Sequence, residues 1–169
     1  MTARGALSVR RAVEADAAAL HSLGVQAVER SAAGHYTREQ LAAWAGRRSV
    51  EGHVRLVAET LTLVAEDGED LAGYASVALS PVGTLVRGEL DQLFVHPRHG
   101  GRGVARLLVG AVEAAAREAG VPELVTHASW RAAPVLARLG FVQVDVETVE
   151  VADQVLTRAR MRKALRPPG

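Results

Sequence analysis

A short segment rich in glycine and arginine is the first candidate for chemistry in this sequence of 169 residues. It reads HPRHGGRGVARLL over residues 96–108 and stands between a strand-like apolar run and a helical apolar pattern. The start of a helix exposes four unpaired N–H groups and about half a positive charge, and glycines let a ligand approach the backbone closely. The segment therefore predicts a local binding site for an anion, although a tight turn from strand to helix also favours glycine.

Two known phosphate-binding motifs do not fit this segment. A P-loop requires a lysine and then a hydroxyl residue after its last glycine, whereas Gly103 is followed by Val104 and Ala105. A dinucleotide-binding turn requires G-x-G-x-x-G at the start of a βαβ unit, whereas Gly101 and Gly103 are followed by Arg106. The sequence therefore excludes a P-loop and argues against a dinucleotide site.

The elements before this segment follow from hydrophobic periodicity. A period of two predicts strands, and apolar spacings of three and four predict helices. Asp16 is expected to open the first helix as its N-cap, and Thr37 with Gln40 is spaced as a capping box for the second. The expected order is a strand, two helices and three antiparallel strands, over residues 7–13, 16–29, 37–46, 61–66, 71–80 and 85–95.

The elements after the segment complete an α+β fold. The longest apolar helical pattern runs from Val104 to Gly120, a strand follows at 123–128, and Ser129 is expected to cap the next helix. Two strands at 141–151 and 155–165 end the chain. The crossover from 85 to 128 should be right-handed with parallel strands. We predict one domain over residues 1–169, with a mixed, mostly antiparallel central sheet flanked by helices.

Composition limits the classes of function. Hydrophobic residues make up 49% and charged residues 23% of the chain, which is typical of a soluble globular protein. A net charge of +1 gives no broad field for nucleic acid. The absence of cysteine excludes disulfides and a thiolate zinc site, and we expect no bound metal. No apolar run reaches the roughly 18 residues of a membrane span and no signal peptide is evident, so we expect a cytoplasmic protein without membrane or nucleic-acid partners.

Residues 93–108, LFVHPRHGGRGVARLL, resemble the acyl-CoA loop of the GCN5-related N-acetyltransferases, Q/R-x-x-G-x-G/A after a strand. When the helix that follows is aligned with that of the family, Gly103 and Ala105 fall on the motif positions G and G/A. Gly100 then falls on the position where the family prefers glutamine or arginine. An alternative alignment places Arg98, Gly101 and Gly103 on the three motif positions and matches the motif, but it starts the helix two residues early. The resemblance implies that acetyl-CoA binds mainly through backbone N–H groups, at Leu93, Phe94, Val95, Gly100, Gly101, Arg102, Gly103, Val104 and Ala105.

The resemblance extends over most of the chain. Residues 9–20 are similar to the first strand and helix of the family, residues 63–77 to its central hairpin, and residues 127–141 to its late motif A-S-x-N-A-x-x-F-Y-E-x-x-G-F. The implied fold is that of the acyl-CoA N-acyltransferases. Where many relatives carry a tyrosine acid, this chain has Leu136. Ser129 or a water molecule is then expected to supply the proton instead.

The reaction implied by the resemblance is direct transfer of an acetyl group from acetyl-CoA to an amine in a ternary complex. An alkyl amine with a pKa of about 10.4 is neutral in roughly one molecule of 2,500 at pH 7, a burden of about 4.6 kcal/mol without a base. Strand alternation predicts that Glu89 and Asp91 share a face with Leu93 and Val95. Glu89, which aligns with the base of histone-acetylating relatives, is the leading candidate for the base and Asp91 its rival; His127 is a third.

The resemblance implies an acceptor groove formed by residues 29–44 and 145–155, with a small molecule or a peptide as the amine acceptor. Acidic side chains in the second segment would suit a cationic amine, although alternating acids on a strand usually form its solvated face: Asp145, Glu147, Glu150 and Asp153. A homodimer through the last strands is a further option within the family. The alternative function is a non-catalytic acyl-CoA-binding module. Leu136 and Gly100, which depart from the family pattern, are compatible with it.

Overall fold

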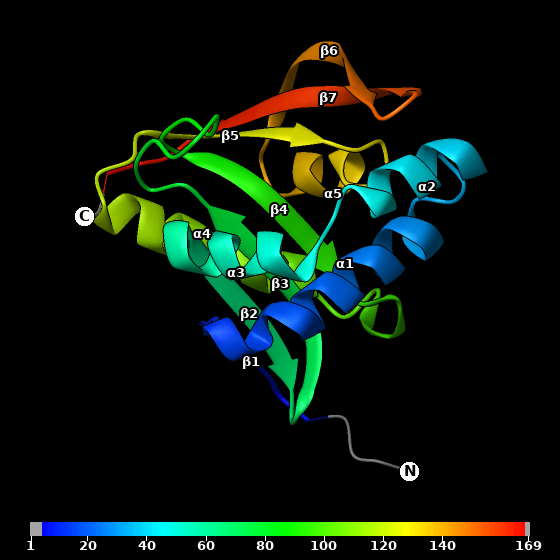
Figure 1. Ribbon diagram of the computed structural model, residues 1–169. Helices are drawn as coiled ribbons and strands as arrows, with labels where there is room; N and C mark the ends of the chain where they lie inside the picture. The colour runs from blue at the N-terminus through cyan, green and yellow to red at the C-terminus, as the bar shows by residue number, and fades with distance from the viewer. Residues whose placement is uncertain (1–4, 168–169) are drawn as a thin grey trace.

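The computed structural model describes residues 5–167 and contains a seven-stranded mixed sheet between two layers of helices (Figure 1). The strand order is β1-β2-β3-β4-β5-β7-β6, and every neighbouring pair is antiparallel except β4 and β5. The predicted α+β class is confirmed. The strands are β1 Leu7–Arg11, β2 Leu61–Asp67, β3 Asp70–Val77, β4 Glu89–Val95, β5 Glu123–Ala128, β6 Val142–Val151 and β7 Gln154–Ala164.

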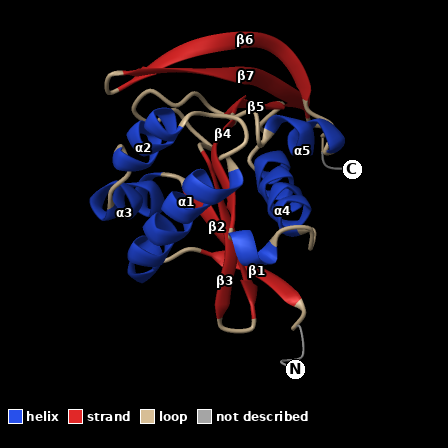
Figure 2. Ribbon diagram, turned by 90° about the vertical axis from the view of Figure 1, so that its right-hand side faces the viewer, coloured by secondary structure: helices blue, strands red, loops and turns tan. Residues whose placement is uncertain are grey.

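Helices cover both faces of the sheet (Figure 2). One face carries α1 Ala17–Ser31, α2 Arg38–Gly46 and α3 Val50–Glu59, and the other carries α4 Val104–Glu118 and α5 Ala133–Arg138. The larger core lies under α4, where Val104, Leu108 and Val112 are buried with residues of β3, β5 and β7. Within residues 5–167, none of the helices combines the length and the apolar character that a membrane span requires.

Strands β4 and β5 separate soon after they meet. Their parallel pairing comprises Glu89 opposite Val125 and Leu90 opposite Thr126. Beyond this point β4 continues to Val95 alongside β3, and β5 continues alongside β7. The two halves of the sheet therefore diverge, and the gap between them can be lined by side chains of both strands.

A β-bulge interrupts β4 at the point of divergence. Gln92 lies opposite Ser76 and Leu90 lies opposite Val77, so Asp91 is the extra residue of β4. A bulge bends a strand and redirects its side chains. Asp91 is thereby placed where β4 leaves β5.

The bulge also changes the alternation along β4. Strict alternation would put Glu89, Asp91, Leu93 and Val95 on one face of the sheet. Instead Leu90, Leu93 and Val95 pack in one core cluster against α4. The prediction of a shared face was therefore wrong, because one extra residue moves the following side chains to the opposite face.

A third helix before the central hairpin was not predicted. Helix α3 begins after Ser49, whose Oγ accepts a hydrogen bond of 3.0 Å from the Gly52 N–H. The helix buries His53 and Leu56. Since His53 is a polar residue at a core position, it interrupts the apolar pattern by which the sequence would have indicated this helix. Its ring is hydrogen-bonded in the core.

Two element boundaries also differ from the prediction. Strand β4 begins at Glu89, not at residue 85, because residues 86–88 form a turn. Helix α5 begins at Ala133, since Ser129 first closes a turn in which its Oγ accepts a hydrogen bond of 3.2 Å from the Ala132 N–H. The remaining predicted strands and helices are confirmed to within a few residues.

A glycine on β3 allows α4 to pack closely on the sheet. A Cβ at Gly73 would lie 2.7 Å from the carbonyl oxygen of Phe94 and 2.8 Å from Cγ1 of Val104. We expect Gly73→Ala to lower the free energy of unfolding by about 1–3 kcal/mol through overpacking, measured by urea denaturation. Gly110→Ala, on an exposed position of α4 with no atom within 4 Å of the added Cβ, should instead raise it by up to about 1 kcal/mol. Equal effects of the two substitutions would contradict the packing argument.

Candidate active site

The glycine-rich segment forms an open loop at the start of α4. Gly101 and Gly103 have φ angles of 72° and 78°, in the left-handed region that favours glycine. The first hydrogen bond of the helix joins the Leu107 N–H to the Gly103 carbonyl at 3.0 Å, so the N–H groups of Val104 and Ala105 precede it and stay free for a ligand. A Cβ on either glycine would meet no atom within 4 Å. The outer side of the loop is therefore open, as an anion site requires.

The side chain of Arg102 anchors this loop. It turns towards the β2–β3 hairpin, where it donates a hydrogen bond of 2.5 Å to Asp67 Oδ2 and lies 2.9 Å from His99 Nδ1. The guanidinium of Arg102 is therefore occupied by the hairpin, and only the backbone N–H of Arg102 is available to a ligand at the loop. Gly100 precedes it with an ordinary extended backbone and has no side chain to contact a ligand.

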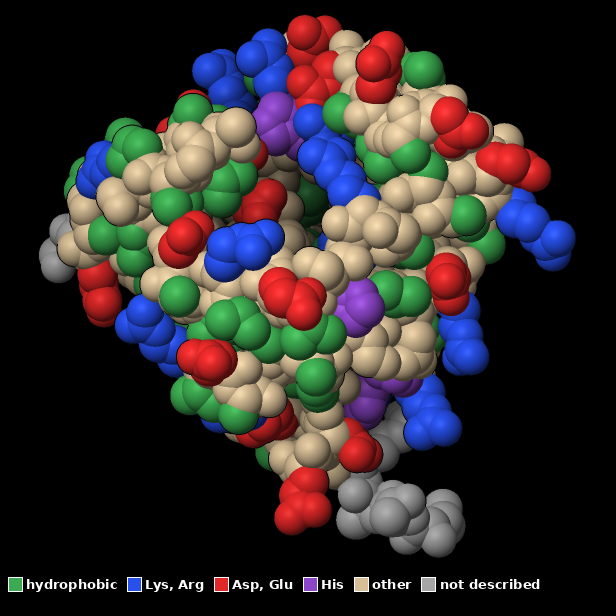
Figure 3. Space-filling view, in the orientation of Figure 1, with side chains coloured by type: hydrophobic (Ala, Val, Ile, Leu, Met, Phe, Trp, Pro, Cys, Tyr) green, Lys and Arg blue, Asp and Glu red, His purple; other side chains and the backbone are tan. Residues whose placement is uncertain are grey.

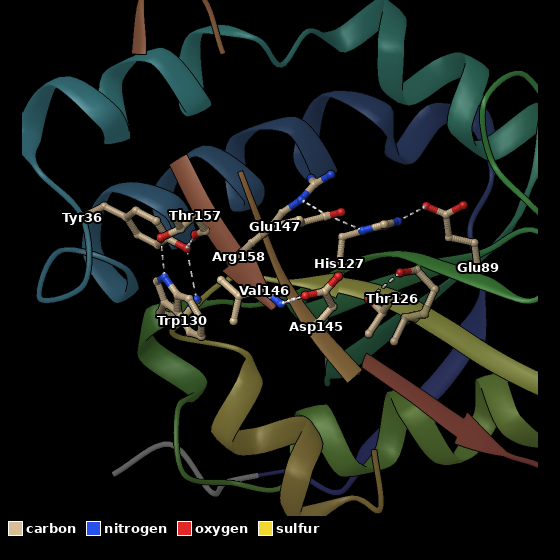
Figure 4. Close-up of polar contacts among 11 residues, drawn as sticks. Tyr36, Glu89, Thr126, His127, Trp130, Asp145, Val146, Glu147, Thr157 and Arg158 are labelled. Atoms are coloured by element: carbon tan, nitrogen blue, oxygen red, sulfur yellow. Dashed lines mark hydrogen bonds and ion pairs between the residues drawn. The ribbon is translucent and has the colours of Figure 1, made fainter. Parts of the chain in front are cut away.

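An acidic cluster gathers side chains from four neighbouring strands (Figure 4). Glu89 Oε1 lies 3.5 Å from His127 Nε2, while His127 Nδ1 donates to Glu147 Oε1, which also accepts a hydrogen bond of 2.6 Å from Arg158 Nε. The buried Glu89 accepts a further hydrogen bond of 2.9 Å from the Val86 N–H. Carboxylates on both ring nitrogens hold the imidazole in one orientation. Within the described residues, no group of three His, Cys, Asp or Glu side chains is placed to hold a metal ion.

The environment shifts the pKa values of two acids beside His127. Burial would raise the pKa of Glu147, but hydrogen bonds from Arg158 and His127 outweigh it and lower the pKa. Burial in the cleft, together with the charge of Glu89, raises the pKa of Asp91. Asp91 is nevertheless an exposed residue of the cleft, so a ligand can approach it there. A carboxylate with a raised pKa binds a proton more readily near neutral pH than an ordinary aspartate does.

Two hollows meet at this cluster. One, of about 410 Å³, is bounded by β4 beyond the bulge, by α2 and α3, and by the ends of β5 and β7. The other, of about 740 Å³, lies between residues 84–86, β5 and β7. Asp91, His127 and Arg158 line both hollows. Figure 3 shows a hollow on this side of the molecule with acidic side chains inside it and basic side chains around its mouth.

A family model for the acetyltransferase (GNAT) domain matches residues 32–165 of the chain. The chain belongs to the GNAT acetyltransferase family. A GCN5-related N-acetyltransferase from Rhodopseudomonas palustris has 29% identity and a TM-score of 0.85, with 98% of this chain and 99% of that chain covered. A search of the curated proteins finds no match.

Two more distant structures share the fold of this GNAT chain. The PaiA N-acetyltransferase from Thermoplasma acidophilum, in complex with coenzyme A, has 17% identity and a TM-score of 0.74, with 94% of this chain and 99% of that chain covered. YncA, a putative acetyltransferase from Salmonella typhimurium with acetyl-CoA, has 21% identity and a TM-score of 0.70, with 98% and 97% covered.

The 410 Å³ hollow of this GNAT chain is closed by contacts between distant segments. Tyr36 donates a hydrogen bond of 2.9 Å to the Thr157 carbonyl and accepts one of 3.1 Å from the Trp130 N–H (Figure 4). Gln40 Nε2 donates to the Val155 carbonyl at 2.8 Å. Burial raises the pKa of Tyr36, so its phenol stays protonated. The loop before α2 is therefore held against β7, where it covers the 410 Å³ hollow.

The structure brings some of the predicted site residues together and separates others. Leu93, Phe94 and Ser129 line the same hollow as Asp91. Glu89 lines the neighbouring hollow, and the loop 100–105 lies at the start of α4 beyond the end of β4. Leu93 and Val95 pack towards α4, whereas Phe94 packs against Tyr74 on the opposite face.

The structure assigns separate surroundings to the four acids predicted near β6. Glu147 turns to His127 and is half-buried, while Asp145, Glu150 and Asp153 are exposed. The solvated-face interpretation therefore describes three of the four. Leu136, at the position of the family's tyrosine, is buried at the wall of the hollow and has no proton to donate.

Proposed function

We propose that this GNAT chain transfers the acetyl group of acetyl-CoA to a primary amine by direct attack within a ternary complex. The observation that carries the proposal is the placement of an exposed acid, Asp91, on β4 and of an open loop with free N–H groups directly after the end of the same strand. Asp91 lies in the bulge of β4, and the loop 100–105 follows the end of that strand. An acetyl transfer needs a base near one end of the extended cofactor and a site for the pyrophosphate near the other, and β4 connects the two.

The residues present suit acetyl-CoA. The free N–H groups from Gly101 to Ala105 would bind the pyrophosphate, and Leu93, Phe94 and Val95 would lie along the pantetheine arm. The CoA and acetyl-CoA complexes of the two distant relatives support this choice of ligand. When bound, acetyl-CoA supplies the reactive thioester.

We assign the general base to Asp91 rather than to Glu89. One oxygen of Glu89 accepts the Val86 N–H and the other faces His127, and its side chain is buried. Asp91 is an exposed residue that lines the cleft, and its pKa is raised. The ammonium group of the acceptor gives a proton to Asp91, and the freed nitrogen lone pair attacks the thioester carbonyl. The C–S bond then breaks, its electron pair leaves with the sulfur, and the nitrogen loses its second proton to water as the amide forms.

The departing sulfur obtains its proton from water, either directly or through Ser129, which water then reprotonates. The Ser129 Oγ accepts a hydrogen bond from the Ala132 N–H, which leaves its own hydrogen free to donate. A thiol with a pKa near 8.5 also leaves tolerably as a thiolate, so the leucine at position 136 slows the step without preventing it. That same leucine is the one observation favouring the second candidate function, a module that binds acyl-CoA without turnover.

Thiol release from acetyl-CoA in the presence of a panel of primary amines separates the two functions. We expect at least one amine to accelerate thiol release well above the background hydrolysis seen without amine. If acetyl-CoA raises the melting temperature and yet no amine accelerates thiol release, the chain is the binding module instead.

The contact between Asp67 and Arg102 allows the role of the loop in acetyl-CoA binding to be tested without changing a proposed catalytic residue. The Arg102 hydrogen bond lowers the pKa of Asp67, so the contact persists at neutral pH and is lost only as the pH falls through the lowered pKa. We expect Asp67→Asn to weaken acetyl-CoA binding at pH 7 by roughly 2- to 10-fold, because the loop loses an anchor. Titration calorimetry measures this. Asp70→Asn, at an exposed position of the same hairpin, is the matched control, and equal loss in both variants would refute the anchoring role.

A further inference from the structure

The junction between α2 and α3 carries an excess of positive charge on one wall of the 410 Å³ hollow. We define the α2–α3 corner as Arg47, Arg48, Ser49 and Arg55, all of which line this hollow. Within residues 5–167, no carboxylate lies within ion-pair distance of any of these three guanidinium groups. The corner is therefore a cationic surface whose three guanidinium groups have no ion-pair partner in the described protein.

Arg48 is held at the corner by uncharged partners. Its Nη2 lies 2.5 Å from the Tyr74 hydroxyl, 2.7 Å from Gln92 Oε1 and 3.1 Å from His53 Nε2, and its guanidinium stacks over Phe94 at 4.6 Å. Burial lowers the pKa of His53 and raises that of Tyr74, so both stay neutral. The Arg48 Nε is buried beside Gly24 of α1 and has no acceptor. Arg48 as a whole is half-buried and lines the hollow, and a cation in such a place is costly unless an anion reaches it.

The start of α3 adds to the positive electrostatic potential of the α2–α3 corner. Ser49 caps this helix of 10 residues, and both Ser49 and Gly52 line the hollow. The N-terminus of a helix carries about half a positive charge and favours an anion. Glu51, in the first turn, is exposed and does not line the hollow. Three arginines and a helix start therefore face the cavity together.

The same hollow carries the opposite charge at β4 and β5, where Asp91 lies beside the Glu89–His127–Glu147 cluster. We propose that the acceptor of this enzyme bears an anionic group, a carboxylate or a phosphate, in addition to its amine. The amine binds at Asp91 and the anionic group at the α2–α3 corner. This inference rests on the proposed acetyl transfer and narrows its acceptor to amines with a fixed negative charge.

The test compares acceptors that differ only in the anionic group. The panel consists of amino acids beside their carboxamides, and aminoalkylphosphonates or aminoalkyl phosphates beside the plain alkylamines. We expect kcat/KM from thiol release to favour the charged member of the best pair by about 10- to 100-fold, as expected for a charge-assisted contact. The pair with the largest ratio distinguishes a carboxylate from a phosphate group.

Two exposed corner residues allow the site to be probed without disturbing the Arg48 network. Arg47→Gln and Arg55→Gln should each reduce the ratio of charged to uncharged acceptor by about 5-fold or more. Arg38→Gln, at an exposed position on α2 that lines neither hollow, should leave the ratio unchanged. A ratio near one in the parent protein, or a ratio that the corner substitutions do not alter, would overturn the inference.

A binding measurement keeps this result separate from the proposed function. The same acceptor pairs are titrated by calorimetry into protein saturated with CoA. A preference for the charged member without any turnover would support the corner and contradict acetyl transfer. Turnover in which neither kcat/KM nor the binding affinity favours the charged acceptor would contradict the anion site at the α2–α3 corner. It would still support acetyl transfer.

Discussion

Replacing Asp91 by asparagine is expected to lower the turnover rate with saturating amine by about 10²- to 10⁴-fold near pH 7, the range of a lost general base. Asparagine keeps the size of the side chain and its place in the bulge but cannot take a proton. Part of the loss should return at high pH, because more of the amine then arrives already deprotonated. The pH dependence of the rate at saturating amine and acetyl-CoA measures both effects.

The direction of the pKa shift at Asp91 fixes the rest of the pH profile. Burial and the Glu89 charge raise this pKa, so the carboxylate forms at a higher pH than that of an ordinary aspartate. The parent rate should rise with pH through that raised value, and this rise should be absent from Asp91→Asn. A folded pKa above the unfolded one also means that ionised Asp91 destabilises the fold at neutral pH. The variant should therefore melt at the same or a higher temperature.

Glu89→Gln is the matched variant for this test. Glutamine can still accept the Val86 N–H, so we expect roughly a tenfold loss of rate or less. If Glu89→Gln shows the large loss with recovery at high pH and Asp91→Asn does not, then Glu89 is the base and our assignment is wrong. If neither variant loses rate, His127 or solvent takes the proton.

Gly103→Glu is expected to abolish acetyl-CoA binding, the largest effect at the loop. The parent should gain about 2.7 kcal/mol of stability at a ligand concentration of 100 times Kd. The variant places a side chain at a φ angle of 78° and a negative charge at the proposed pyrophosphate site. We expect its affinity to fall by about 100-fold or more, so the shift in melting temperature on adding acetyl-CoA should disappear.

The strain at Gly103 lowers stability by itself, so each variant is compared with and without ligand. Gly110→Glu adds the same charge at an exposed position further along α4 and serves as the control. It should retain the full shift. A Gly103→Glu protein that acetyl-CoA still stabilises like the parent would remove the loop from the binding site.

Local signals in the sequence predicted the parts of the fold that depend on neighbouring residues. Thr37 and Gln40 form the predicted capping box, with hydrogen bonds of 2.9 and 3.1 Å. The helix after the glycine loop begins at Val104 and leads to Gly120, whose φ angle is 69°. These features were predictable because each is set by side chains only a few residues apart.

The arrangement of the acidic cluster was not predictable in this way. The bulge at Asp91 depends on how β3 and β4 pair, and the contact of His127 with Glu147 depends on the order β5-β7-β6. Sequence alternation could not show which of the four acids near β6 turns inward, because β6 is itself irregular between Gln143 and Asp145. The charged α2–α3 corner was missed together with α3, since His53 occupies a core position there.

The most direct test of acetyl transfer follows isotope-labelled acetyl groups from acetyl-CoA by mass spectrometry while thiol release is recorded in the same sample. We predict that the label appears on the nitrogen of the acceptor, one acetyl group for each thiol released, and that Asp91→Asn slows both in parallel. Label that stays on CoA with every amine, while acetyl-CoA still stabilises the protein, would contradict the account.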